Sequence, residues 1–403
     1  MNPYIARLHP YPFERLAMLI GGVEPPLGKA PISLSIGEPR HAPPAFIVEA
    51  LARYTPDGLS RYPVARGLPE LRAAMVQSLT QRYGLAADAL DPDRQVLPVT
   101  GTREGLFSLI QAVIDPRLPH PTVVMPNPFY QIYEGATLLA GAEPWYLNTP
   151  EETDFLPDFD AVPNEVWERC QALVLCSPGN PTGAVMSAED WQTAFALADR
   201  HDFIIVADEC YADLYTDEAQ PPVGALQAAV AAGRNDFERL VTFHSLSKRS
   251  SVPGLRSGLV AGATNLIEPL ALYRTYHGCA LAVPAQQASI EAWRDTAHVV
   301  DNRHRYQTKF EAARRILGAV TDVRIPPAAF YLWLKVADGD DERFARELYA
   351  REVLITLPGR YLSRPTPAGD PGAGHVRVSL VPDEATCEEA LTRLARFVSS
   401  YSG

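Results

Sequence analysis

Short apolar runs recur through the middle of the chain. Five of them lack the alternation of polar and apolar residues that a strand with one exposed face shows. Strands that are buried on both faces have this pattern, so the runs predict a largely parallel sheet covered by helices. The runs are "TVVMP" (122–126), "ALVLCSP" (172–178), "FIIVADE" (203–209), "RLVTF" (239–243) and "GLVAG" (258–262).

A helix is predicted between the second and third of these strands. In "SAEDWQTAFALADRH", Ser187 and Asp190 have the spacing of a capping box, and Trp191 and Phe195 belong to an inward face. A strand, a capped helix and a second strand within about thirty residues form a βαβ unit. "GTREGLFSLIQAVID" predicts another helix, with its free backbone N–H groups near its start.

The pattern changes on both sides of this region. The first 45 or so residues are rich in proline and predict an extended arm, whereas spacing from Pro284 to about Ile316 predicts one long helix. "AFYLWLKV" and "HVRVSLV" then alternate with period two, and an amphipathic helix follows. We therefore expect an N-terminal arm and part of a small domain in 1–45, a large domain in 46–285, and a small C-terminal domain in 286–403.

Composition limits what such a protein could bind. The 403 residues carry a net charge of -12, which gives no general attraction to nucleic acid or anionic membranes. The five cysteines are scattered and form no CxxC pair, so neither a disulfide framework nor a metal site is expected. The N-terminus lacks the apolar core of a signal peptide and no run approaches the length of a membrane span, so we expect a cytoplasmic protein.

Polar residues follow several of the predicted strands. Asn180 lies in "SPGNPTG", Asp208 and Tyr211 in "DECY", Lys248 in "HSLSK", and Arg256 opens the next strand. Ligands of parallel sheets bind at this carboxyl edge. Singly, an asparagine could make a turn and a lysine could be a solvated surface charge. Asp208 ends a strongly apolar strand, however, and a buried carboxylate needs a cationic or hydrogen-bonding partner.

A second group of residues suits a phosphate dianion. Ser245 and Ser247 supply hydroxyls, Arg256 supplies a guanidinium, and the helix that begins near Gly101 and Thr102 supplies backbone donors.

One ligand satisfies both groups, namely pyridoxal 5'-phosphate (PLP). Its aldehyde suits capture by Lys248 as a Schiff base, its pyridinium N–H suits Asp208, and its phenolic oxygen suits Asn180 and Tyr211. We therefore expect PLP as the cofactor and no metal.

These motifs resemble a known family. "SPGNPTG", "DECY", "SLSK" and Arg256, eight residues beyond the lysine, are similar to the class I aminotransferases of PLP fold type I. The resemblance continues through "SIGEP", "YPVARGLPELR", "GTREGLF", "PNPFYQIY" and "HVRVSL", and so spans nearly the whole chain. It implies an α/β fold with a large PLP-binding domain around a mostly parallel central sheet, and a smaller α+β domain.

The resemblance implies further cofactor contacts. The "GTREGLF" match adds Arg103 to the residues near the phosphate, and Tyr130 matches the aromatic residue that stacks on the pyridine ring. Tyr62 resembles a tyrosine that reaches the cofactor of the neighbouring subunit, which implies a homodimer with shared active sites.

Other matches concern the substrate. Arg377 matches the arginine that binds the substrate α-carboxylate, whose bidentate fork a lysine could not reproduce. Gly37 resembles the point where the main chain approaches the substrate, and Asn180 is implied to contact both substrate and cofactor. In isolation, Arg377 could equally be a solvated charge on an edge strand.

The resemblance also implies a mechanism. Lys248, Asp208 and Tyr211 form the catalytic set, in which Lys248 moves the proton from the donor's Cα and Asp208 keeps the ring nitrogen protonated. Arg249, directly after Lys248, receives no role.

The substrate is less tightly indicated. "SLSKRSSVPGLRSG" and the opening "MNPYIARLHPYPFERL" are most similar to the bacterial N-succinyl-L,L-diaminopimelate aminotransferases of lysine biosynthesis, in which glutamate donates its amino group to N-succinyl-2-amino-6-ketopimelate and becomes 2-oxoglutarate. Alternatives are an aspartate, kynurenine or acetylornithine-type aminotransferase, or a PLP-dependent β-lyase. A PLP-sensing regulator is disfavoured, because no basic DNA-binding module precedes the motifs.

Overall fold

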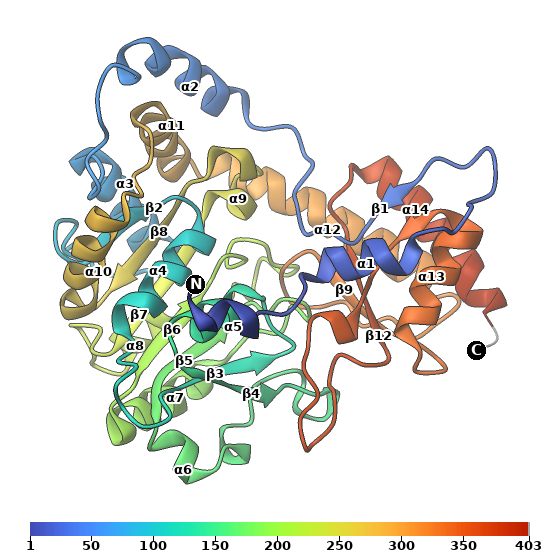
Figure 1. Ribbon diagram of the computed structural model, residues 1–403. Coiled ribbons are helices and arrows are strands. Elements are labelled where there is room, and N and C mark those ends of the chain that lie inside the picture. The colour runs from blue at the N-terminus through green and yellow to red at the C-terminus, as the bar shows by residue number, and fades with distance from the viewer. Residues whose placement is uncertain (402–403) are drawn as a thin grey trace.

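The structure is a computed structural model that describes residues 1–401. Its largest element is a seven-stranded sheet of order β2-β8-β7-β6-β5-β3-β4 (Figure 1). The strands are β2 (Val96–Val99), β3 (Thr122–Asn127), β4 (Glu143–Asn148), β5 (Cys170–Cys176), β6 (Ile204–Asp208), β7 (Leu240–Ser245) and β8 (Gly258–Gly262). Only β8 runs antiparallel to its neighbours β7 and β2. All five strands predicted from the apolar runs are present, and the largely parallel character is confirmed.

Helices cover both faces of this sheet, because alternate residues of each strand point to opposite sides. In β5, Leu173 and Leu175 enter the core beneath one set of helices, while Ala172 and Val174 enter the core on the other face. The first set includes α2 (Ala45–Gly58), α3 (Pro69–Tyr83), α7 (Ala188–His201), α8 (Ala225–Ala231) and α11 (Val283–Arg294). The second includes α4 (Thr102–Val113), α5 (Ile132–Leu139) and α10 (Thr264–His277).

The predicted βαβ unit is β5-α7-β6. Ser187 caps α7, and its side chain accepts a hydrogen bond from the backbone N–H of Asp190 while the Asp190 carboxylate accepts one from the Ser187 backbone. Trp191 and Phe195 are buried, so the capping box and the inward face are both confirmed.

A second group of elements has its own core. β9 (Tyr331–Lys335), β11 (Leu357–Pro358) and β12 (His375–Ser379) form an antiparallel sheet with β12 in the middle. Helices α12 (Ala297–Leu317), α13 (Asp341–Glu352) and α14 (Glu384–Ser400) pack with it around a separate cluster of buried apolar residues. Figure 1 shows α12 running between the two groups of elements. The exact domain limits stay a prediction.

The first 45 residues are less extended than predicted. They contain η1 (Pro3–Arg7), α1 (Pro12–Ile20) and β1 (Ile32–Ser33). Proline is tolerated in the first turn of a helix, so Pro12 starts α1 rather than preventing it. α1 packs against α13 and β11, and β1 pairs in parallel with β10 (Leu354–Ile355).

The prediction of one long helix from Pro284 to about Ile316 is wrong, because the structure has two helices there, α11 and α12. The chain leaves the helical conformation at Asp295, which has φ -86° and ψ 131°, and α12 begins two residues later. The Asp295 side chain accepts a hydrogen bond from the backbone N–H of His298 at 2.9 Å. A side chain that satisfies a free N–H in this way starts a new helix, although the apolar spacing continues across the break.

The remaining short elements connect these layers. They are α6 (Asn164–Trp167), α9 (Leu246–Arg249), η2 (Glu151–Thr153), η3 (Phe159–Ala161), η4 (Pro253–Leu255) and η5 (Gly359–Tyr361). All five cysteines are free. Within residues 1–401, no helix is both long and apolar enough to cross a membrane.

Candidate active site

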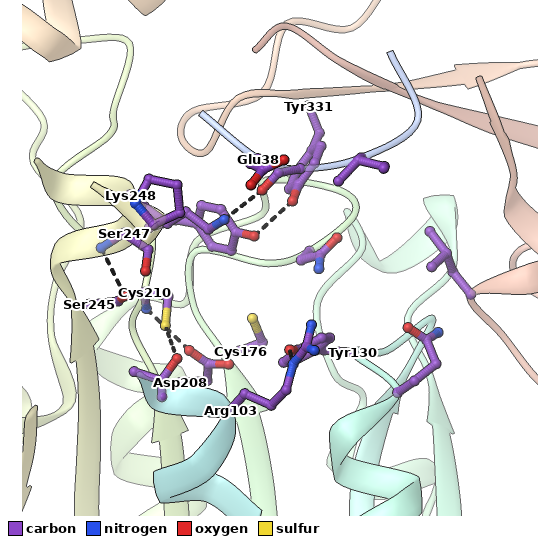
Figure 2. Close-up of a pocket in the computed structure, with 18 of the residues that line it drawn as sticks. Glu38, Arg103, Tyr130, Cys176, Asp208, Cys210, Ser245, Ser247, Lys248 and Tyr331 are labelled. Carbon is purple, nitrogen blue, oxygen red and sulfur yellow. Dashed lines mark hydrogen bonds between the residues drawn. The ribbon is translucent and has the colours of Figure 1, made fainter. Parts of the chain in front are cut away.

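A pocket of about 510 Å³ opens at the carboxyl ends of β5, β6 and β7. It brings together twelve of the fourteen residues that were predicted to form the site. These are Gly37, Thr102, Arg103, Tyr130, Asn180, Asp208, Tyr211, Ser245, Ser247, Lys248, Arg256 and Arg377. Figure 2 shows Ser245, Ser247 and Lys248 on one side of the pocket and Arg103 and Tyr130 on the other.

Asp208 ends β6 at the floor of the pocket and is 4% exposed. One carboxylate oxygen accepts a hydrogen bond from the Tyr133 hydroxyl at 2.6 Å, and the other accepts one from the Cys210 backbone N–H at 3.2 Å. Among the described residues, no lysine or arginine forms an ion pair with it. A buried carboxylate with no cation suits a ligand that brings a positive N–H group.

The phosphate group of residues lies beside α9 and the start of α4. Ser245 caps α9, and its hydroxyl accepts a hydrogen bond from the Ser247 backbone N–H at 3.1 Å. Gly101 caps α4 with φ 78° and ψ 150°, and a Cβ atom there would clash with the Arg256 guanidinium. Arg256 precedes β8 by two residues rather than opening it. Glycine at position 101 thus leaves room for a guanidinium beside a helix N-terminus, which is a cradle for a phosphate.

Lys248 lies on α9 and donates a hydrogen bond from Nζ to the Gly37 carbonyl oxygen at 2.5 Å. Burial, and then the positive charges of Arg377 and Arg256, lower the pKa of Lys248 to about 8. A larger share of this amine is therefore neutral near pH 7 than of a surface lysine, as a nucleophile or a base requires.

Two tyrosine hydroxyls meet in the pocket. Tyr211 follows β6 and Tyr331 opens β9, and their hydroxyls share a hydrogen bond of 2.7 Å. The Tyr331 hydroxyl also occupies the space beside Gly37 that a Cβ atom would need. The glycine therefore lets a tyrosine from the second group of elements reach the pocket.

Arg377 lies on the central strand β12 and is 4% exposed, so it is not a solvated charge on an edge strand. It donates hydrogen bonds to Asn180 Oδ1 at 2.9 Å and to the Ser35 carbonyl oxygen at 2.6 Å. Its Nε is buried and has no partner in the part of the chain that the structure describes. A desolvated guanidinium with a donor to spare suits a carboxylate ligand.

Across the pocket, Arg103 Nε donates a hydrogen bond to the Tyr130 hydroxyl at 2.5 Å. The Tyr130 ring also meets the Tyr133 ring edge-on, with centroids 5.7 Å apart. The stacking role of Tyr130 stays a prediction.

Two predicted site residues do not line the pocket. Gly101 lies at the N-terminus of α4, in contact with the Arg256 guanidinium. Tyr62 is fully exposed, and its predicted contact with a neighbouring subunit stays a prediction. Arg249 also lies outside the pocket, where it donates to the Ala292 carbonyl oxygen at 2.7 Å and pairs with Asp213 at 3.3 Å.

Sequence reasoning missed several residues that line the pocket, including Tyr11, Glu38, Tyr133 and Tyr331. Tyr133 lies in the first turn of α5, whereas Tyr130 precedes that helix, so helical spacing did not link the two tyrosines. Tyr331 carried no local signal either, because only the packing of β9 against the loop at Gly37 brings it there.

The fold and this site define a PLP-dependent enzyme of fold type I, and comparison with known proteins places it further. Residues 29–394 match the family "Aminotransferase class I and II". The chain therefore belongs to the class I and II aminotransferases.

Individual relatives agree with this placement. An LL-diaminopimelate aminotransferase of Dehalococcoides mccartyi is 32% identical over 99% of both chains. The crystal structure of an aminotransferase from Neisseria meningitidis is 48% identical, covers 98% of this chain and 100% of its own, and superposes with a TM-score of 0.94. The aminotransferase AspB of Helicobacter pylori is 36% identical with the same coverage and a TM-score of 0.89.

The cofactor is pyridoxal 5'-phosphate, and the residues present fit it. Lys248 offers an amine with a lowered pKa, Asp208 offers a buried carboxylate without a cation, and Gly101 leaves space beside Arg256 for a phosphate. These three features stand at separate parts of one pocket, as a molecule with an aldehyde, a ring nitrogen and a phosphate requires.

Proposed function

We propose that the enzyme catalyses the reversible transamination between N-succinyl-L,L-diaminopimelate plus 2-oxoglutarate and N-succinyl-2-amino-6-ketopimelate plus glutamate, with glutamate as the amino donor in lysine biosynthesis. The observation that carries this proposal is that the pocket holds two arginines, Arg377 and Arg103, besides Arg256 at the phosphate cradle. Arg377 comes from β12 and Arg103 from α4, so a donor with carboxylates at both ends would meet a cation at each. This proposal extends the resemblance of the motifs around Lys248.

PLP supplies an aldehyde that bonds to amines and a ring that accepts electrons. Lys248 Nζ takes the proton from the Cα of the donor, as a base with a lowered pKa can do near neutral pH. Arg377 holds the donor's α-carboxylate through a bidentate pair, with its own position fixed by Asn180 and Ser35. Asp208 holds the proton on the ring nitrogen, and the Tyr133 hydroxyl holds Asp208 in place.

Unacylated L,L-diaminopimelate is a second candidate. The curated relative from D. mccartyi carries that name. Glu38 lines the pocket and offers a carboxylate for the donor's distal ammonium group, which the succinylated compound lacks. The two candidates thus differ in the charge at the far end of the donor.

A comparison of donors tests the proposal. The PLP-loaded enzyme would be assayed with N-succinyl-L,L-diaminopimelate, L,L-diaminopimelate, aspartate, kynurenine and N-acetylornithine, with 2-oxoglutarate as acceptor and glutamate as the measured product. We expect the highest kcat/KM with the succinylated donor. A higher value with any other donor contradicts the proposal, and release of pyruvate and ammonia from cystathionine would indicate a β-lyase instead.

Variants at Arg103 test the second cation. Arg103→Gln should raise KM for the succinylated donor about ten-fold, because a charge-assisted hydrogen bond contributes roughly 1.5–3 kcal/mol. Alanine, which has no distal carboxylate, serves as the control donor and should be unaffected. Tyr130→Phe keeps Arg103 and the ring but removes the hydrogen bond between them, so it separates loss of the cation from a shift of the ring. Equal effects on both donors would contradict the role of Arg103.

We also propose that the enzyme is a homodimer in which Tyr62 completes the site of the partner. Tyr62 is fully exposed, and Leu59, Val64, Leu272 and Tyr276 are further exposed apolar side chains. A mixture of Lys248→Ala and Tyr62→Ala chains tests this, because a mixed dimer holds one site with both residues intact. Activity that rises after mixing is expected, and activity that never exceeds the two separate variants contradicts the proposal.

A further inference from the structure

A row of buried polar side chains runs behind Lys248, away from the pocket. It consists of His41, Asn302 and Lys309, which are 4%, 7% and 1% exposed. His41 lies between β1 and α2, whereas Asn302 and Lys309 lie on one face of α12, two helical turns apart. The row connects elements that are distant in the sequence.

The hydrogen bonds of this row all run from donor to acceptor in one order, from Lys309 to His41 and from His41 to Asn302. Lys309 Nζ donates to the Leu380 carbonyl oxygen at 3.1 Å and lies 2.5 Å from His41 Nε2. Burial, followed by the charge of Lys309, lowers the pKa of His41 to about 4, so the imidazole is neutral and Nε2 accepts. His41 Nδ1 then carries the hydrogen and donates to Asn302 Oδ1 at 2.9 Å. Each donor along the row has an acceptor.

The row ends on the helix that carries Lys248. The Asn302 side-chain amide donates to the carbonyl oxygens of Lys248 at 3.1 Å and Arg249 at 3.2 Å. These carbonyls belong to α9, which has four residues and therefore little stability of its own. The last carbonyls of a helix have no partner within it, and here Asn302 supplies one.

The other end of the row touches the strand that carries Arg377. Leu380 directly follows β12, and its carbonyl oxygen is the acceptor for Lys309. The row thus joins the backbone just after β12, three residues beyond Arg377, to the backbone of Lys248 through buried side chains.

A contribution to the stability of the fold does not explain why a lysine is buried in this row. Among the described residues, no carboxylate lies within ion-pair distance of the Lys309 ammonium, and its removal from water lowers the pKa of Lys309 to about 8. A buried charge without a counter-ion destabilises a fold, and an apolar side chain of similar length would do so less.

We propose that Asn302 is a positioning residue that orients Lys248, and that His41 and Lys309 transmit to it the position of the strand carrying Arg377. This inference rests on the role proposed for Lys248 but not on the identity of the donor. It assigns the three residues to the reaction without any contact with substrate or cofactor.

Asn302→Leu tests the orienting role, with Gln286→Leu as the matched control. Gln286 is 1% exposed and bridges two backbone segments, accepting from Leu68 N at 2.7 Å and donating to Leu281 O at 2.7 Å. Both variants should lose similar thermal stability. Only Asn302→Leu should shift the midpoint of the pH titration of the holoenzyme's visible absorbance, and its kcat should fall about ten- to hundred-fold. An unshifted midpoint with wild-type kcat overturns the proposal.

Lys309→Met tests the transmission and remains informative if Asn302→Leu does not fold. We expect its thermal midpoint to equal or exceed the wild type while its kcat falls and its absorbance titration shifts. A parallel loss of stability and kcat with an unshifted titration would show a structural role only and overturn the proposal.

The double variant shows whether the two residues act in sequence. If Lys309 acts through Asn302, then kcat of the double variant equals that of Asn302→Leu alone, whereas multiplicative losses contradict transmission. Lys248→Ala separates these results from a failure of the proposed function. If Lys248 does not hold the cofactor, that variant keeps the titrating absorbance band, whatever the variants of the row do.

Discussion

Replacement of Gly101 by alanine should weaken PLP binding as well as the fold. Gly101 has φ 78° and ψ 150°, a region that is essentially restricted to glycine and costs other residues roughly 1–3 kcal/mol. The added methyl group would also displace the Arg256 guanidinium, which is otherwise held by its hydrogen bond to the Pro253 carbonyl oxygen at 2.9 Å.

The loss in affinity follows from the displaced guanidinium. A hydrogen bond to a charged group contributes roughly 1.5–3 kcal/mol, and 1.4 kcal/mol is about a factor of ten in an equilibrium constant. We therefore expect the dissociation constant of PLP to rise about ten- to hundred-fold. Equilibrium dialysis of the apoenzyme against PLP measures this, and urea denaturation of the apoenzyme measures the change in the free energy of unfolding.

Gly233→Ala is the matched control. Gly233 has φ 77° and no atom within 4 Å of the position that a Cβ would occupy, so alanine there adds backbone strain without a clash. It should lower the free energy of unfolding by about 1 kcal/mol and leave PLP affinity unchanged. If Gly101→Ala binds PLP as tightly as the wild type while both variants lose stability, the proposed phosphate cradle is refuted.

Further predictions concern the floor, the carboxylate site and the amine of the pocket. Tyr133→Phe removes the 2.6 Å hydrogen bond to Asp208 and should lower kcat about ten-fold. Tyr146→Phe is the control, because it removes a 2.6 Å hydrogen bond to Glu134 outside the pocket and should leave kcat unchanged. Equal steady-state rates in the two variants would contradict the role of Tyr133. Arg377→Lys should raise KM for every amino donor about ten- to hundred-fold, because lysine cannot form the bidentate pair, and an unchanged KM would exclude the α-carboxylate role. The rate at which apoenzyme captures PLP should rise with pH and level off above about 8, where Lys248 is neutral; in stopped-flow absorbance measurements, a rate that keeps rising to the pKa of a free lysine would contradict the lowered pKa.

The sequence predicted the residues of the site better than their surroundings. Asn180, Asp208 and Lys248 each follow an apolar run, and the carboxyl ends of parallel strands meet at one edge, so their meeting followed from local pattern and topology together. The capping box of Ser187 and Asp190 was similarly local.

Contacts made by tertiary packing gave no local signal. Asn302 and His41 meet only because α12 crosses between the two groups of elements, and nothing in their own neighbourhoods indicates it. The break at Asp295 was missed because a local signal was misleading: the apolar spacing on either side of it fits one continuous helix. The orientation of β8 also could not be told from "GLVAG", because an apolar run has no intrinsic direction.

The pairing of β1 with β10 sets an order for folding during synthesis. Ile32 and Ser33 pair with Leu354 and Ile355, so β1 has no strand partner until the chain has been synthesised as far as these two residues. The seven-stranded sheet ends at Gly262 and can assemble earlier, because domains fold as units while the chain emerges. Ile32 and Ser33 therefore stay without a strand partner while the large sheet assembles, and β1 is among the last strands to be completed.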